Sequence, residues 1–330
     1  MTSSPSDPPV AIAWSSHLSE HQVAEVADLV HRVAQQDGVH PLSEHAWLHL
    51  RHGGDEHGQH LLALDAGGKL IGYGHLDVTD EVAGPSSEVV VDPAHRRRGV
   101  GTRLITEMIR STQGRPLRMW AHGEQAAAGE WAQSLGFARA RVLWQMRRSL
   151  HAPLPPVVLP EGIVLRPFIP GLDDQAWVAL NHRAFSGHPE QGTWTLDDLH
   201  HRMAEPWFSA EGFLIAVVKD PDHESAVVKD PDSTVAFDQM VGFHWTKVHG
   251  VSSHAHEAIG EVYVVGVDPT WQGRGLGRAL TLAGLHHLRS LGLSAAMLYV
   301  EASNTAAIDL YTSLGFAQWD VDVLYRSAQR

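Results

Sequence analysis

Two stretches decide the fold: Val90-Val91-Asp92-Pro93-Ala94-His95-Arg96-Arg97-Arg98-Gly99-Val100-Gly101 and Gly266-Val267-Asp268-Pro269-Thr270-Trp271-Gln272-Gly273-Arg274-Gly275-Leu276-Gly277. In each, an apolar run stops at Asp-Pro, and Arg-Gly-x-Gly then opens a helical pattern. A Ser-Leu-Gly-Phe string follows later in each half, at Ser134–Phe137 and Ser313–Phe316. A repeat of this length indicates two copies of one domain, and the differences between the copies should show which one carries out chemistry.

Composition excludes several classes of protein. The 330 residues are enough for two domains, and the formal net charge of −13 argues against a nucleic-acid partner. No apolar run approaches the roughly 20 residues that cross a bilayer. Met1–Val10 lacks the features of a signal peptide, so we expect a cytoplasmic protein without a membrane partner. The absence of cysteine excludes disulfides and thiolate nucleophiles.

The 24 histidines raise the question of a metal site. His45 and His49 stand four residues apart on a predicted helix, but the others are scattered and no His-Glu-x-x-His string occurs. We therefore expect solvated or hydrogen-bonded histidines and no metal.

A proline-rich linker at residues 151–162 separates a predicted N-terminal domain, residues 1–150, from a C-terminal domain, residues 163–330. Both halves show strands first and then strands alternating with helices, which is typical of a mixed α/β domain. The periodicity predicts, among others, helices at Ser19–Gln36 and Ser43–Arg51 and a strand at Val142–Arg147. The duplicated heptapeptide AVVKDPD, at Ala216–Asp222 and Ala226–Asp232, indicates a lengthened surface loop without an assigned function.

The repeated turn has the chemistry of a phosphate-binding site. A strand that enters a helix through Gly-x-Gly leaves backbone amides free at the helix N-terminus, where the helix dipole favours an anion. Neighbouring arginines add positive charge. The alternative is a tight strand-to-helix turn with incidental arginines.

The pattern [Gln/Arg]-x-x-Gly-x-Gly, at Arg96–Gly101 and Gln272–Gly277, resembles the acetyl-CoA pyrophosphate loop of the GNAT N-acetyltransferases. Asn304, Tyr311 and Leu314-Gly315-Phe316 are similar to the C-terminal motif of that family. The resemblance covers both halves. It implies a mixed α/β (α+β) protein of two tandem GNAT domains, each a mostly antiparallel twisted sheet flanked by helices.

Longer strings resemble the mycothiol synthases, a family of tandem GNAT enzymes. They include Phe185–Gly192, Gly242–His249, Gly260–Val264, Trp120–Gly123 and Gln145–Arg148. The resemblance implies acetyl-CoA as co-substrate and an amino sugar–inositol thiol as partner. The reaction would acetylate the cysteinyl amine of Cys-GlcN-Ins (desacetylmycothiol) to give mycothiol, and we expect a monomer.

The two halves differ where the chemistry needs polar groups. Aligning the Ser-Leu-Gly-Phe strings sets Tyr311 against Ala132 and Asn304 against Gln125, and aligning the Asp-Pro pairs sets Glu261 against Pro85. Amide formation from a thioester needs a base for the amine and a donor for the leaving thiolate. We predict Glu261 as base and Tyr311 as acid, so that the N-terminal domain binds coenzyme at most. Taken singly, a solvated Glu and a packing Tyr are the alternatives.

The resemblance also implies two sets of binding residues. The coenzyme set comprises Val265, Gly266, Val267, Gln272, Gly273, Arg274, Gly275, Leu276, Gly277, Arg278, Asn304, Thr305, Ala306, Ala307, Ile308 and Asp309, with Val89, Val90, Val91, Arg97, Arg98, Gly99, Val100, Gly101 and Thr102 in the first half. The acceptor set comprises Glu44, Glu190, Lys247, Glu261 and Tyr299. A GNAT acting on another amine, such as an aminoglycoside, and a non-catalytic acyl-CoA sensor are the alternative functions.

Overall fold

The computed structural model describes residues 10–52, 58–78, 84–123, 126–187, 191–219, 239–249 and 258–328. The chain forms two compact units: unit 1 is Met1–Trp144, Glu301–Ser303 and Asp320–Arg330, and unit 2 is Gln145–Val300 and Asn304–Trp319. This division differs from the domain boundary expected at residue 150. The end of the first half belongs to unit 2, and the end of the chain belongs to unit 1.

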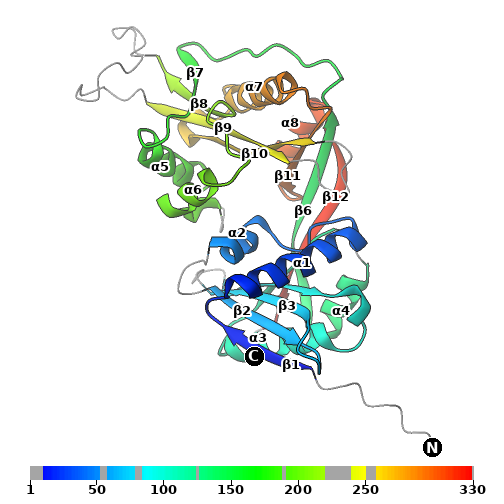
Figure 1. The fold of residues 1–330 in the computed structure, drawn as a ribbon. Helices are drawn as coiled ribbons and strands as arrows, with labels where there is room; N and C mark the ends of the chain where they lie inside the picture. The colour runs from blue at the N-terminus through cyan, green and yellow to red at the C-terminus, as the bar shows by residue number, and fades with distance from the viewer. Residues whose placement is uncertain are drawn as a thin grey trace, which may run out of the picture. The chain divides into compact units, whose positions relative to one another are not determined.

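Unit 1 is a twisted sheet with helices on both faces (Figure 1). Its strands follow the order β1-β2-β3-β4-β5-β12, and only β4 and β5 are parallel. Helices α1 and α2 pack against Leu62 and Tyr73 on one face, and α3 packs against Leu61 and Ile71 on the other. The elements are β1 (Ala11–Ser15), α1 (Glu20–Asp37), α2 (Glu44–His52), β2 (Gly58–Leu64), β3 (Leu70–Asp77), β4 (Ser86–Val91), α3 (Val100–Ser111), β5 (Arg118–Ala121), α4 (Ala126–Ser134) and β12 (Ala317–Ser327).

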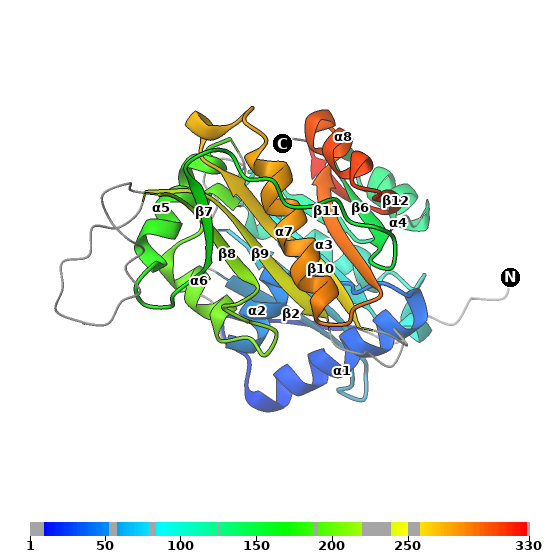
Figure 2. The ribbon, with the colours of Figure 1, turned by 90° about the horizontal axis from the view of Figure 1, so that it is seen from above.

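Unit 2 repeats this plan in the order β6-β11-β10-β9-β8-β7, with β10 and β11 parallel. Strand β6 belongs to both units, because its residues up to Trp144 lie in unit 1 and those from Gln145 lie in unit 2. Helices α5 and α6 cover a core around Trp177 and Trp245, and α7 lies along the opposite face through Leu276 and Leu280 (Figure 2). The elements are β6 (Phe137–Ser149), β7 (Ile163–Pro167), α5 (Asp174–Ala184), α6 (Leu196–Met203), β8 (Phe213–Val218), β9 (Met240–His249), β10 (Ile259–Val267), α7 (Leu276–Ser290), β11 (Ala295–Glu301) and α8 (Thr305–Ser313).

The predicted fold class, mixed and mostly antiparallel, is confirmed. The helices predicted at Ser19–Gln36 and Ser43–Arg51 form with ends shifted by one residue, and Ser19 closes a capping box with Gln22. The strand predicted at Val142–Arg147 is longer, Phe137–Ser149. Strand β1 was not predicted. Apart from Ala216–Lys219, the duplicated heptapeptides lie outside the described residues. No helix among the described residues combines the length and hydropathy needed to cross a membrane.

Candidate active site

The strand-to-helix turn has the same backbone architecture in both units. Asp92 and Asp268 each accept a hydrogen bond 3.0 Å long from the amide two residues later, which stops the strand. Gly99 and Gly275 then begin α3 and α7 with φ of +81° and +83°, the left-handed region that favours glycine. Neither helix has a side-chain cap, so the amides of its first turn are left for an anion.

Inside the turn the two copies differ at one backbone position. Gly273 has φ of +75°, and its counterpart Arg97 has φ of +61°, where a side chain is strained. Not every arginine beside the turn serves an anion, since Arg96 donates two hydrogen bonds to Asp37, at 2.8 and 2.7 Å. Arg97 and Arg98 are exposed. In the second copy, Arg274 lies over the ring of Trp271, 4.6 Å from its centroid.

The two parallel strands of each unit separate before they reach the turn. In unit 2, β10 and β11 pair at Gly260–Ala296 and at Glu261–Met297. The described residues of β10 after Glu261 form no further pairs with β11. The predicted coenzyme residues Val265–Val267 lie beyond this point. In unit 1, β4 and β5 pair at Ser86–Arg118 and Ser87–Met119, and Val89–Val91 lie beyond. Both units therefore have strand backbone next to the turn without a partner on the neighbouring parallel strand.

A β-bulge distinguishes unit 2. Thr246 pairs with Val262 and Trp245 pairs with Val264, so Tyr263 is an extra residue in β10. The corresponding ladder between β3 and β4 is regular throughout. A bulge leaves the extra residue unpaired and re-aims the strand, which suits it to presenting an amide to a ligand.

The bulge also corrects the sequence alignment of the two halves. Counting back from the Asp-Pro pairs matched Glu261 with Pro85. In the ladders, Glu261 opposes Lys247, and the equivalent pair in unit 1 is Ser86 and Asp77. Glu261 therefore corresponds to Ser86 and not to Pro85, because β4 lacks the extra residue of the bulge.

Glu261 is 7 % exposed and lies on the same face of the sheet as its partners on β9. Its Oε2 is 2.7 Å from Nε2 of His249. Burial alone would raise the pKa of Glu261, but the hydrogen bond with His249 and the charges of His249 and Lys247 lower it below its ordinary value. The carboxyl is therefore ionised at neutral pH, as a general base must be.

Tyr311 lies near the end of α8 and packs edge-on against Phe316, with ring centroids 5.9 Å apart. Its hydroxyl makes no hydrogen bond among the described residues. Burial raises its pKa to about 12, so the phenol stays protonated at neutral pH and has a proton to donate. Asn304 caps α8 by accepting a hydrogen bond 3.1 Å long from the Ala307 amide. Thr305–Asp309 form the first turns of this helix.

The predicted acceptor residues lie on several elements. Lys247 places its ammonium 4.7 Å from the ring centroid of Trp207 and 5.3 Å from that of Tyr263. Tyr299 on β11 is 41 % exposed and its hydroxyl accepts a hydrogen bond 2.8 Å long from Gln145. Glu44 is the first residue of α2, in unit 1. Glu190 lies outside the described residues.

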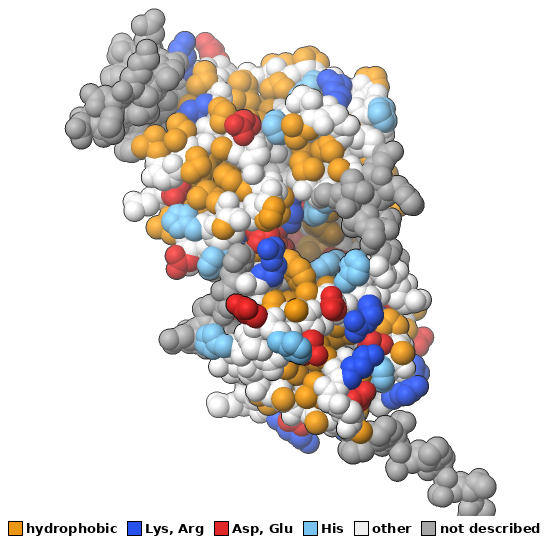
Figure 3. Space-filling view, in the orientation of Figure 1, with side chains coloured by type: hydrophobic (Ala, Val, Ile, Leu, Met, Phe, Trp, Pro, Cys, Tyr) orange, Lys and Arg blue, Asp and Glu red, His pale blue; other side chains and the backbone are white. Residues whose placement is uncertain are grey.

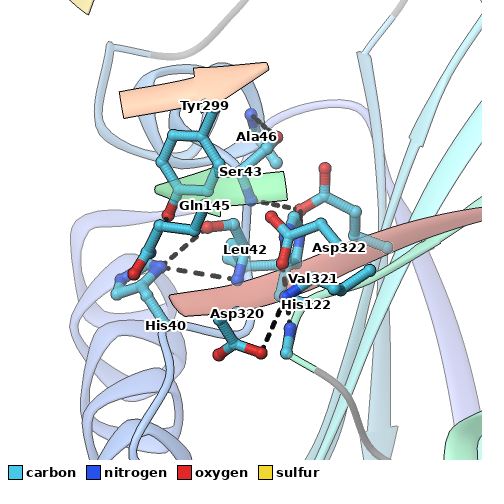
Figure 4. A network of polar contacts seen from close by, with 12 residues as sticks. His40, Leu42, Ser43, Ala46, His122, Gln145, Tyr299, Asp320, Val321 and Asp322 are labelled. Atoms are coloured by element: carbon cyan, nitrogen blue, oxygen red, sulfur yellow. Dashed lines mark hydrogen bonds and ion pairs between the residues drawn. The ribbon is translucent and has the colours of Figure 1, made fainter. Parts of the chain in front are cut away.

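Unit 1 holds a buried charged cluster on the strand that matches β10. Glu88 of β4 stands where β10 has Val264, and it accepts a hydrogen bond 2.6 Å long from the Ser43 amide. His122 lies 3.7 Å from Glu88 and 3.1 Å from Asp322, which it faces in Figure 4. Burial opposes both charges, yet the contact with His122 lowers the pKa of Glu88 to about 2. The contacts with Asp322 and Glu88 raise the pKa of His122 to about 10.

Comparison with known proteins agrees with this arrangement. Residues 56–139 match an acetyltransferase (GNAT) domain model, and residues 187–316 match the acetyltransferase (GNAT) family model. A mycothiol acetyltransferase of Streptosporangium roseum is 52 % identical, with 94 % of this chain and 97 % of the relative covered. One from Acidothermus cellulolyticus is also 52 % identical, with 96 % and 95 % covered.

This chain belongs to the mycothiol acetyltransferase family. It is therefore an acetyltransferase, of the GNAT class, whose members take the acyl group from an acyl-CoA. A solved tandem GNAT protein from the clavulanic acid biosynthesis pathway has the same fold, with a TM-score of 0.68 at 16 % identity over 97 % of this chain and 98 % of that one. The two tandem GNAT domains predicted from the repeat are confirmed, and the sensor alternative no longer describes the whole chain.

Two further observations concern metal binding and the distribution of surface charge. The described residues contain no group of three or more His, Asp or Glu side chains arranged to hold a metal ion. Acidic and basic side chains are interspersed on the face shown in Figure 3. Sequence reasoning missed His249 as a neighbour of Glu261. Its two-residue spacing from Lys247 places those two side chains on one face of β9, but the contact with Glu261 depends on the register between β9 and β10.

Proposed function

We propose that unit 2 transfers the acetyl group of acetyl-CoA directly to the cysteinyl amine of Cys-GlcN-Ins, giving mycothiol. The observation that carries the proposal is the ionised, buried Glu261 placed two residues before the β-bulge, a combination that β4 lacks. The names of the full-length relatives support this acceptor.

The proton balance assigns a role to each residue. The acceptor arrives as an ammonium, and Glu261 takes one proton so that the nitrogen has a lone pair for attack. The C–N bond forms, the C–S bond breaks, and a second proton leaves the nitrogen as the amide forms. Tyr311 gives its proton to the departing sulfur and is reprotonated, so one of the two protons ends on CoA and the other in solvent.

The backbone supplies the remaining electrostatics. An amide at the bulge stabilises the thioester oxygen as it becomes negative. The first turn of α7, entered through Gly273 and Gly275, holds the pyrophosphate of acetyl-CoA. A Cβ at either glycine would meet no atom within 4 Å, so the site has room for the anion, and the positive φ values explain why glycine stands there. Asn304 and the first turns of α8 complete the coenzyme set.

Unit 1 keeps the turn and lacks the base, the bulge and the tyrosine. We propose that Val89–Val91 and Arg97–Thr102 bind acetyl-CoA without transferring its acetyl group. Glu88 adds a second argument, because a carboxylate at the position of Val264 would repel a developing oxyanion.

The acceptor is tested by turnover of an amine panel with acetyl-CoA, followed by mass spectrometry. We expect Cys-GlcN-Ins to be acetylated with a kcat/KM at least about 100-fold above that of any aminoglycoside, since a site built for one set of polar groups discriminates strongly. Equal or faster turnover of an aminoglycoside would reject the acceptor and retain the reaction class. Tyr311→Phe should lower kcat about 10- to 100-fold with little change in the KM for acetyl-CoA.

A further inference from the structure

The neighbour of Glu261 on β9 has no role in the reaction as described so far. His249 is two residues from Lys247 on the same strand, so both side chains point to the face that carries Glu261. The contact between His249 Nε2 and Glu261 Oε2, at 2.7 Å, is within the range of a strong charge-assisted hydrogen bond.

We propose that His249 is a positioning residue for acetyl transfer: its Nε2–H holds Oε2 of Glu261 and leaves Oε1 for the acceptor ammonium. This inference rests on the proposed function for the identity of the amine. Because the carboxylate has no proton to give, the imidazole is the donor in this pair. Glu261 Oε1 makes no hydrogen bond within the described part of the chain, so it is the oxygen available to a substrate.

The groups around Glu261 and His249 show why the carboxylate needs a hydrogen bond to hold its orientation. Lys247 acts on Glu261 through its charge, while its ammonium sits over the Trp207 and Tyr263 rings. On the same side, Arg202 of α6 donates a 2.8 Å hydrogen bond to the Tyr263 hydroxyl. His249 donates a direct hydrogen bond to the carboxylate, and this bond fixes which of the two oxygens faces β9.

His249 is not needed to fill the core. About a third of its side chain is exposed, whereas the Glu261 side chain is 9 % exposed. A substitution at position 249 can therefore change the hydrogen bond while the packing of unit 2 is largely kept.

The test compares His249→Phe, which removes the donor, with His249→Gln, whose amide N–H can replace it. We expect His249→Phe to lower kcat about 10- to 100-fold and to leave the KM for acetyl-CoA unchanged. It should also move the acidic limb of the pH profile of kcat/KM up by about one unit, because burial then raises the pKa of Glu261 with less opposition. His249→Gln should restore most of kcat.

A second measurement does not depend on the acceptor. The carboxyl ¹³C signal of Glu261, assigned by its loss in Glu261→Gln, should titrate at higher pH in His249→Phe than in the unchanged protein. His286→Phe is the matched control, because this histidine of α7 is partly exposed like His249, and it should alter neither measurement.

The outcomes separate the two proposals. A titration of Glu261 and a kcat that are both unchanged in His249→Phe would overturn the role of His249. Failure of the unchanged protein to acetylate Cys-GlcN-Ins would reject the proposed acceptor, and the ¹³C titration would still decide whether His249 controls Glu261.

Discussion

The two copies of the strand-to-helix turn have nearly the same backbone, yet the strands that lead to them differ. Asp92 and Asp268 stop the strands in the same way, and Gly99 and Gly275 begin the helices with almost equal φ. Upstream, β10 has a bulge and a buried glutamate, whereas β4 is regular and has Ser86 at the matching place. The proposed function therefore assigns anion binding to the turn and acetyl transfer to the strand before it.

The corresponding strands of the two units also carry different kinds of charged group. Unit 1 uses its corresponding strand for a buried ion cluster, in which Glu88 and Asp322 flank His122. Asp322 comes from β12, the last strand of the chain, so the cluster ties that strand to unit 1. Unit 2 has at this strand the glutamate that we propose as the base, whereas unit 1 has charged groups that lie close to one another.

The largest expected effect is on kcat/KM when Glu261, the residue that most distinguishes β10 from β4, is replaced. Glu261→Gln should lower kcat/KM about 1,000-fold, equivalent to about 4 kcal/mol, because the amine loses its base. The matched change in unit 1, Ser86→Ala, should alter it less than about threefold. Steady-state kinetics with Cys-GlcN-Ins measures both, and comparable losses would show that the first-half strand also takes part.

The next effect concerns the stability of unit 1. His122→Leu should lower the free energy of unfolding by about 3 kcal/mol, because Glu88 and Asp322 are left buried without a cation. Urea denaturation measures it, with His21→Leu, at a side chain that is 82 % exposed, as a control that should change it by less than about 0.5 kcal/mol. A neutral His122→Leu would mean that the cluster is not charged as described.

The pH dependence of this difference follows from the two shifted groups. The pKa of His122 rises from 6.5 to about 10 in the folded state, so its contribution is complete below pH 6.5 and is lost as pH rises toward 10. The pKa of Glu88 falls from 4.5 to about 2, so its contribution is present above pH 4.5 and is lost as pH falls toward 2. The stability gap between the unchanged protein and His122→Leu should therefore be widest between pH 4.5 and 6.5.

The smallest expected effect concerns Arg97 and Gly273, which occupy the same position in the two turns. Arg97→Gly should stabilise unit 1 by up to about 1 kcal/mol, because it removes a side chain from a left-handed conformation. The reciprocal change, Gly273→Arg, should destabilise unit 2 by a similar amount, since only φ and not space opposes a side chain there. Thermal unfolding monitored in each unit checks both signs, and two shifts of the same sign would refute the equivalence of these positions.

Much of the fold could be predicted from local sequence. The Asp-Pro stop, the glycines and the helical periodicity locate the turn and its helices because each acts within a few residues. The strand at Val142–Arg147 was recognised as a strand, but its pairing depends on distant residues. Local patterns could not reveal that its end joins unit 2 while β12 joins unit 1.

For the candidate site too, local sequence indicated residue types but not the features that depend on strand pairing. Residue types indicated Glu261 and Tyr311, and their surroundings fit a base and an acid. The bulge at Tyr263 is a single extra residue whose presence is decided by pairing with β9, so the alignment selected Pro85 in place of Ser86. The contact between His249 and Glu261 likewise requires the register of two strands.

One measurement tests most directly the claim that unit 2 alone transfers the acetyl group. The double variant Glu261→Gln/Tyr311→Phe leaves every residue of the first turn unchanged, and its acetylated product can be counted by mass spectrometry under single-turnover conditions. The account predicts that product formation falls by at least about 1,000-fold while acetyl-CoA still binds. Product formed within about tenfold of the rate of the unchanged protein would contradict it, because unit 1 would then be catalysing the transfer.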